Sequence, residues 1–164
     1  GEGVRIERGK GVLLDVVQHD RSTGHIGSRG ASVDVLALPA ALAGEHGLLP
    51  EQILKTLIVA GPSGLGVAVL PVPGKLSLKA AAAALGWPKA TMADRSAAER
   101  STGYVLGGIS PLGQRRRLPT VLDACACEFD RVLCSAGKRG WDIALAPQDL
   151  VRLSGAVVAD IRAG

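Results

Sequence analysis

The clearest pattern along the chain is a pair of short apolar runs, rich in Val, Ile and Leu. They cover residues 56–60 and 65–70, and Gly61-Pro62-Ser63-Gly64 separates them. Two strand-length apolar runs around a four-residue turn predict a β-hairpin. Similar runs predict further strands at residues 11–19, 104–106, 120–123, 131–135 and 156–161.

Short helices are predicted where a capping residue or a proline precedes a run with high helix propensity. Ser77 can cap an alanine-rich helix that Gly86 ends. Ser96 and Glu99 form a capping-box pattern ahead of Gly103. Together these signals predict helices at residues 38–46, 50–55, 77–85, 96–102 and 147–153.

Irregular alternation of short strands and short helices predicts an α+β fold. Because at least two strands are linked as a hairpin, we expect a mixed, mostly antiparallel sheet rather than a parallel doubly wound one. The 164 residues have the size of one ordinary domain, and no repeat or linker divides them. We therefore expect one domain over residues 1–164, with a polar, glycine-rich segment at residues 1–10 that predicts no element.

Composition excludes several classes of protein. Apolar residues make up 47% of the chain, which argues against disorder, yet no apolar run approaches the roughly 20 residues of a membrane span. No export signal is recognised, so a cytoplasmic location is expected. The three cysteines, Cys125, Cys127 and Cys134, favour reduced thiols over a disulfide framework. The histidines lie far from them in sequence, so neither a metal nor another cofactor is expected.

The charge balance is mildly basic. Lys and Arg number 19 against 15 Asp and Glu, for a net charge of +4. This permits nucleic acid as a partner without requiring it. With one Phe, one Tyr and two Trp, the chain is poorly equipped for an aromatic platform that stacks bases.

A glycine-rich segment at residues 107–113 is the strongest local signal for a functional site. Gly107 and Gly108 would let a substrate approach the backbone, and exposed N–H groups could point at a carbonyl oxygen or a phosphate. Such a segment is equally typical of a tight structural turn. Recognised nucleophile-elbow, zinc-protease and P-loop patterns are missing from the sequence.

Two basic features accompany this segment. Lys55 precedes an apolar strand and could bind a phosphate or carboxylate in a cleft, although a solvated surface lysine fits the same pattern. Basic residues also follow the glycine-rich segment and lie between Gly137 and Gly140. They could contact an RNA backbone in a salt-dependent way, or form solvated basic turns.

Taken together, these stretches resemble the YbaK/EbsC family of aminoacyl-tRNA deacylases, also seen as the editing domain inserted in some prolyl-tRNA synthetases. The resemblance covers about residues 48–161 and is most specific from Ser101 to Gln114. Within the family it is greatest to the branch that acts on Cys-tRNA(Pro). It implies a compact barrel-like mixed sheet surrounded by helices, with no metal.

The resemblance also implies roles for individual residues. It puts Lys55 in the role of the key cleft lysine and the backbone of Gly107 and Gly108 beside the ester carbonyl. Substrate contacts are implied for His19, Ile109, Ser110, Ser135, Gly137 and Asp142. Contacts with tRNA are expected from Arg115, Arg116, Lys138 and Arg139. The implied partner is the aminoacylated 3′ end of tRNA, with prolyl-tRNA synthetase as a second candidate partner.

The family chemistry needs no nucleophile from the protein. In the cysteine-specific branch the thiol of the substrate attacks its own ester carbonyl and leaves as a thiolactone, so the protein positions the thiol and stabilises the oxyanion. Two alternatives stay open. One is an inactive module that only binds tRNA or a synthetase, since Val17 stands where the family often has Tyr. The other is a deacylase for Ala- or Ser-charged tRNA.

Overall fold

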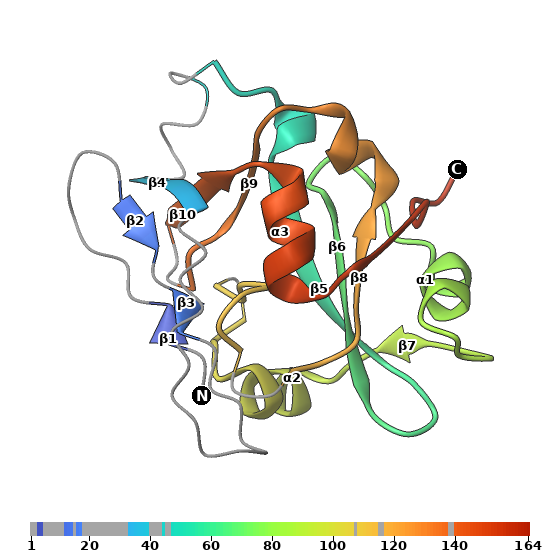
Figure 1. Cartoon of the computed structure of the whole chain (residues 1–164). Helices are drawn as coiled ribbons and strands as arrows, with labels where there is room; N and C mark the ends of the chain where they lie inside the picture. Colours follow the sequence, from blue (N-terminus) through green and yellow to red (C-terminus); the bar gives the residue numbers. More distant parts are fainter. Residues whose placement is uncertain are drawn as a thin grey trace.

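The computed structural model describes residues 3–4, 12–14, 16–17, 33–39, 44, 47–106, 108–114, 117–137 and 140–164. Within these residues the elements follow one another as shown in Figure 1: β1 (Gly3–Val4), β2 (Val12–Leu14), β3 (Val16–Val17), β4 (Val33–Pro39), the 3-10 helix η3 (Pro50–Gln52), β5 (Leu54–Ala60), β6 (Leu65–Pro71), α1 (Leu78–Ala84), β7 (Thr91–Met92), α2 (Arg95–Thr102), β8 (Thr120–Asp123), the 3-10 helix η4 (Ala124–Glu128), β9 (Val132–Ser135), β10 (Trp141–Leu145), α3 (Pro147–Ser154) and β11 (Val157–Ala159).

Two sheets contain most of the described strands. A five-stranded sheet has the order β11-β8-β6-β5-β7, in which β6, β8 and β11 are parallel neighbours and β5 pairs antiparallel with β6 and β7. A four-stranded antiparallel sheet has the order β2-β4-β10-β9, and β1 pairs with β3. This confirms the predicted α+β class with a mixed, mostly antiparallel arrangement.

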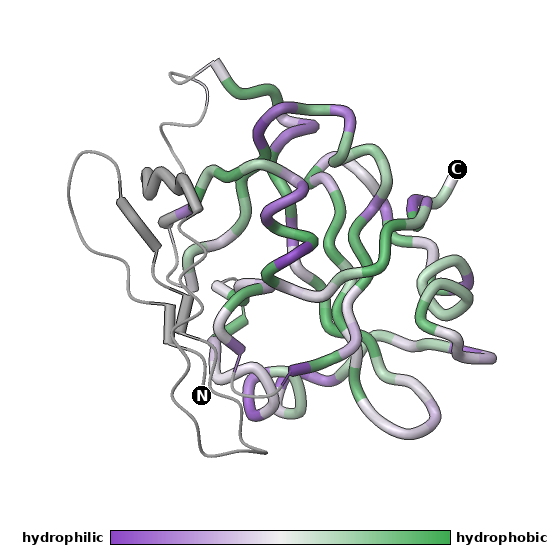
Figure 2. The backbone as a smooth tube through the Cα atoms, in the orientation of Figure 1, coloured by the Kyte–Doolittle hydropathy of each residue, from purple (hydrophilic) through white to green (hydrophobic). Residues whose placement is uncertain are grey.

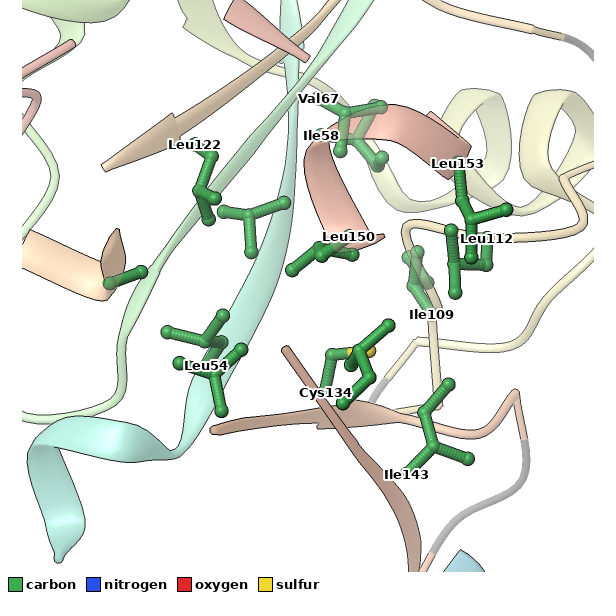
Figure 3. Packing of buried hydrophobic residues seen from close by; sticks show 14 of the residues in the cluster. Leu54, Ile58, Val67, Ile109, Leu112, Leu122, Cys134, Ile143, Leu150 and Leu153 are labelled. Carbon is green, nitrogen blue, oxygen red and sulfur yellow. The ribbon is translucent and has the colours of Figure 1, made fainter. Parts of the chain in front are cut away.

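The two sheets meet where β5 begins. Ile53 and Leu133 form an isolated parallel bridge that joins the start of β5 to β9. Buried side chains from both sheets, from α3 and from the segment before β8 pack into one cluster, called here the main core (Figure 3). Its larger members are Leu54, Ile58, Val67, Val69, Ile109, Leu112, Leu122, Val132, Cys134, Ile143, Leu145, Leu150 and Leu153.

The five-stranded sheet is buried on its other face as well. Ala68 and Leu70 of β6 and Val121 of β8 alternate with the main-core residues and pack instead against Ala81 of α1 and against Ile161. Figure 2 shows this as mostly green tube along the central strands, whereas α3 alternates green and purple along its turns. No helix in the described part of the chain is long and apolar enough to cross a bilayer.

Local signals placed several elements correctly. The hairpin of β5 and β6 is confirmed, and so is the helix that Ser77 caps, where its hydroxyl accepts from the Ala80 amide at 3.1 Å. Gly155 ends α3 in the left-handed conformation, as predicted. The start predicted for α2 was wrong. Asp94, not Ser96, is the N-cap, and its side chain accepts from the Ala97 amide at 3.0 Å, so Ser96 lies inside the first turn.

Three further predictions were wrong in part. Residues 104–106 form no strand, and the amides of Tyr104 and Leu106 donate to side chains of α2 instead of to a strand partner. The helix predicted at residues 50–55 stops at Gln52, since Leu54 already pairs in β5. Leu38 and Pro39, predicted to begin a helix, end strand β4. The loop predicted at residues 21–31 lies outside the described residues.

Leu150 tests the main core. It is 1% exposed, and a Leu150→Ala variant leaves a cavity between α3 and the sheets. We expect it to lose about 2–5 kcal/mol of unfolding free energy in urea denaturation. Val158→Ala is the control, because its side chain is 45% exposed and the change should stay within about 0.5 kcal/mol. Equal losses in the two variants would contradict this packing.

Candidate functional site

Lys55 lies on the face of β5 that points away from the main core. Leu54 and Ile58 belong to the main core, and successive side chains on a strand point to opposite faces. The Lys55 ammonium is partly buried and donates to the carbonyl oxygen of Gly74, in the turn after β6, at 2.6 Å. The lysine is therefore held in a defined position rather than extended into solvent.

Ser135 and Asp142 share one face of the four-stranded sheet. They are directly opposite each other in the β9–β10 pairing. Their neighbours Cys134 and Ile143 belong to the main core, so Ser135 and Asp142 point the other way.

The bridge between the sheets relates this pair to Lys55. β5 and β9 run parallel from the bridge of Ile53 with Leu133, and both bridge residues lie on the side away from the main core. Lys55 and Ser135 each lie two residues beyond the bridge, on the same side. Lys55, Ser135 and Asp142 thus all point away from the main core, and we call this set the strand-face group. Among the described residues the Lys55 ammonium is hydrogen-bonded to Gly74 and not to either of the other two.

Asp142 is the electrostatically unusual member of the group. It is about half-buried, and burial raises the pKa of its carboxyl above the usual value. Among the described residues no cation forms an ion pair with it. A carboxylate that has lost part of its hydration without gaining a partner favours the approach of a positively charged ligand.

The segment at residues 108–114 packs with its side chains inward. Ile109 and Leu112 are buried in the main core. The Ser110 side chain is 2% exposed, and its hydroxyl accepts from the Leu112 amide at 3.2 Å. The substrate contacts predicted for Ile109 and Ser110 can therefore come only from their main chain.

The place predicted for the Gly108 backbone, beside the ester carbonyl, stays a prediction, and its amide is already hydrogen-bonded within the protein. Its amide already donates to the carbonyl oxygen of Val105 at 2.9 Å, which closes a turn. No acceptor for the amides of Ile109 and Ser110 is found in the described part of the chain. Both residues precede Pro111, which has no N–H group, and their amides are therefore candidates for the main-chain donors of the predicted site.

Tyr104 links this segment to the strand-face group. Its hydroxyl donates to the Leu112 carbonyl oxygen at 2.6 Å. Its ring lies against Gly137, two residues after Ser135, where an added Cβ would be 2.6 Å from Cε1. Among the described residues no hydrogen bond joins Lys55 to Gly108, because the lysine donates to Gly74 and the glycine amide donates to Val105.

Sequence reasoning missed Tyr104 and Thr56. Tyr104 had been read as part of a strand, although its place within the specific run of residues 101–114 could have marked it. Thr56 follows Lys55, and its buried hydroxyl lacks a hydrogen-bond partner among the described residues. An unpaired buried hydroxyl is uncommon in folded proteins and is a further candidate for a ligand contact.

Several predicted site residues lie outside the described residues. These are His19, Gly107, Arg115, Arg116, Lys138 and Arg139. Their roles in substrate and tRNA binding stay predictions.

The cysteines are free thiols, and two of them are poorly suited to nucleophilic attack. Burial, with the nearby charge of Asp142, raises the pKa of the Cys134 thiol. Burial and a hydrogen bond with Asp123 raise the pKa of Cys125 to about 12. A thiol attacks as its thiolate, so neither is activated at neutral pH. In the described part of the chain no group of three His, Cys, Asp or Glu residues could hold a metal ion.

Comparison with known proteins gives consistent matches. Residues 35–153 match the family described as the aminoacyl-tRNA editing domain. An Enterococcus faecalis protein, provisionally named Cys-tRNA(Pro)/Cys-tRNA(Cys) deacylase EbsC, is 38% identical over 122 residues, which are 74% of each chain.

Solved structures agree. A crystal structure provisionally assigned as a trans-editing enzyme for prolyl-tRNA synthetase is 28% identical, with a TM-score of 0.72, over 80% of this chain and 87% of that chain. The crystal structure of the hypothetical protein APE2540 is 27% identical, with a TM-score of 0.71, over 83% and 95%. The resemblance drawn from the sequence is confirmed, and the chain belongs to the aminoacyl-tRNA editing domain family.

Proposed function

We propose that this chain removes cysteine from mischarged tRNA(Pro), using the thiol of the substrate as the nucleophile. Membership of the editing family makes the chain an aminoacyl-tRNA deacylase that acts on the charged 3′ end of tRNA. The proposal adds the amino acid and the chemistry. It is supported by one observation above all: the Ser135 hydroxyl has no hydrogen bond to a base among the described residues, and the neighbouring Cys134 thiol is buried in the main core with a raised pKa.

Asp142 would receive the α-ammonium group of the aminoacyl ester. Its half-buried carboxylate has no cationic partner among the described residues, and a bound ammonium would supply one. Hydrogen bonds between opposite charges are about twice as strong as neutral ones. This contact would fix one end of the amino acid beside Ser135, its partner across β9 and β10.

Lys55 would bind the ester or the phosphate of the terminal nucleotide. An ammonium group has three donors, and Gly74 takes one of them. The other two remain for an oxygen of the substrate. Because the bond to Gly74 already orders the side chain, less conformational entropy is lost when the substrate binds.

The reaction would proceed by intramolecular attack. The sulfur of the cysteinyl group bonds to the ester carbonyl carbon, the bond from that carbon to the ribose oxygen breaks, and the thiol proton passes to the ribose oxygen. The products are a cyclic thiolactone and free tRNA. The amides of Ile109 and Ser110, with the predicted contribution of Gly107, would donate to the developing oxyanion, where one donor is typically worth about 100- to 1,000-fold in kcat.

Two parts of the predicted assembly remain proposals. Basic residues at positions 115, 116, 138 and 139 would contact the tRNA backbone, and a prolyl-tRNA synthetase would present the mischarged tRNA. Binding to phosphates in this way would weaken as salt concentration rises.

A panel of charged tRNAs tests the thiol mechanism. Cys-tRNA(Pro) should be deacylated more than about 100-fold faster than Ser-tRNA(Pro) or Ala-tRNA(Pro), because only cysteine supplies a well-oriented intramolecular thiol. Mass spectrometry should detect the thiolactone. Equal rates for cysteine and serine would rule out thiol participation, and binding without turnover of any charged tRNA would identify an inactive binding module.

Lys55→Ala tests the cleft cation. We expect kcat/KM for Cys-tRNA(Pro) to fall by about 100-fold or more, because an electrostatic contact to the reacting ester is lost. Lys79→Ala on α1 is the matched control, since it removes an exposed lysine that is not a member of the strand-face group. Circular dichroism checks that both variants are folded. Unchanged deacylation by the folded Lys55→Ala variant would remove this lysine from the mechanism.

Asp142→Asn separates function from stability. Because its pKa is raised in the folded protein, this carboxyl holds its proton more tightly there than in the unfolded chain. Its ionisation therefore lowers stability as pH rises from the ordinary aspartate pKa, about 3.9, through the raised pKa. At pH 7 the Asn variant should melt no lower than the wild type, with a difference that shrinks toward pH 3, while deacylation falls at least about 10-fold.

The opposite result would show that Asp142 serves the fold. A variant with a lower melting temperature at pH 7 and full deacylation activity would contradict the assigned contact with the substrate ammonium.

A further inference from the structure

Tyr104 lies at the junction of two segments that are distant in sequence. Its hydroxyl donates to the carbonyl oxygen of Leu112 at 2.6 Å, within the segment at residues 108–114. Its ring packs on Gly137, within the turn at residues 135–137 that follows β9. One side chain thus touches both Leu112, in the segment that carries the Ile109 and Ser110 amides, and Gly137, two residues after Ser135.

The contact with Gly137 leaves no room for a side chain. A Cβ built there would lie 2.6 Å from Cε1 of Tyr104, which is closer than Cβ atoms approach other atoms in folded proteins, and 3.2 Å from Cζ. Gly137 also has a φ of 86°, which favours glycine. Its amide donates to the Ser135 hydroxyl at 3.3 Å, so a shift of Gly137 would be transmitted to Ser135.

Tyr104 is itself fixed to the end of α2. Its amide donates to the Thr102 hydroxyl at 3.2 Å, and that hydroxyl donates to the Ala98 carbonyl oxygen at 2.8 Å. Thr102 is 1% exposed, and Gly103 ends the helix in the left-handed conformation. The tyrosine backbone is therefore anchored to a helix, independently of the two segments that its side chain touches.

The hydroxyl of Tyr104 stays a donor at physiological pH. Burial, with the nearby thiol of Cys134, raises the pKa of the phenol above its ordinary value of 10.0. The Leu112 carbonyl oxygen can only accept, so this hydrogen bond needs the protonated phenol.

We propose that Tyr104 is a positioning residue that fixes the separation between residues 108–114 and the turn at residues 135–137. Through it, the main-chain amides of Ile109 and Ser110 keep their place relative to Ser135 and Asp142. The consequence for catalysis rests on the proposed function, because it matters only if the ester lies between these segments. A residue of this kind affects turnover more than substrate binding, since displacements of about 1 Å reduce rates strongly.

Tyr104→Phe removes the hydroxyl and keeps the ring. We expect faster amide hydrogen exchange at Leu112 and its neighbours, with a melting temperature close to that of the wild type. For Cys-tRNA(Pro), kcat should fall by about 3- to 10-fold, as expected for one neutral hydrogen bond, with KM unchanged. A purely structural role would lower the melting temperature and leave kcat of the folded protein intact.

A substitution at Gly137 tests whether the Tyr104 ring positions the two segments. Gly137→Ala should displace the ring, so that hydrogen exchange becomes faster in both segments and kcat falls. In a Tyr104→Leu background the methyl group meets a smaller side chain, and its effect should be less than half as large. Gly86→Ala is the matched control, because Gly86 has a φ of 75° and nothing within 4 Å of an added Cβ. It carries the backbone strain alone and should leave both exchange and kcat unchanged.

Hydrogen exchange separates the two hypotheses. If the wild-type protein deacylates no charged tRNA, the proposed function is wrong, and exchange alone decides the role of Tyr104. If exchange in residues 108–114 is the same in wild type and Tyr104→Phe, or if Gly137→Ala has the same effect with and without the ring, the positioning role is overturned.

Discussion

The structure depends on the opposite orientation of alternate side chains on β5. Leu54 and Ile58 pack into the main core, and this fixes the strand between the two sheets. The same alternation forces Lys55 to the other side, where the Gly74 carbonyl oxygen holds its ammonium. The hydrophobic packing that stabilises the fold therefore also sets the direction of the candidate catalytic cation. A shift of one residue in the pairing of β5 with β6 would bury the charge and expose the leucine.

In residues 108–114, too, some groups pack into the main core and others remain for a ligand. Ile109 and Leu112 are anchored in the main core, and the Ser110 hydroxyl is satisfied by the Leu112 amide. Because the side chains of Ile109, Ser110 and Leu112 are used for packing, these three residues can offer a substrate only main-chain groups. This suits an oxyanion, which needs rigid donors more than a particular side chain. It also explains why the buried residues here are small or aliphatic.

Elements were predicted correctly from the sequence where a few neighbouring residues decide the local structure. Ser77 and Gly155 bound their helices as local capping rules require, and Gly61 to Gly64 separate the strands of the hairpin. Strands β4 and β10 were not predicted, because each contains an aspartate and is stabilised by pairing with the other. Likewise, the link between Tyr104 and Gly137 joins residues 33 positions apart, a contact that no local rule predicts.

Asp123 and Asp142 differ in how their carboxylates are compensated by neighbouring groups. Asp123 is fully buried, yet its carboxylate accepts from the Ile161 amide at 3.0 Å and pairs with the Arg162 guanidinium at 3.1 Å. It holds the C-terminal segment against β8. Asp142 is half-buried, and no described cation compensates its charge. A half-buried carboxylate without a cationic partner among the described residues is compatible with the proposed contact to the ammonium group of the substrate.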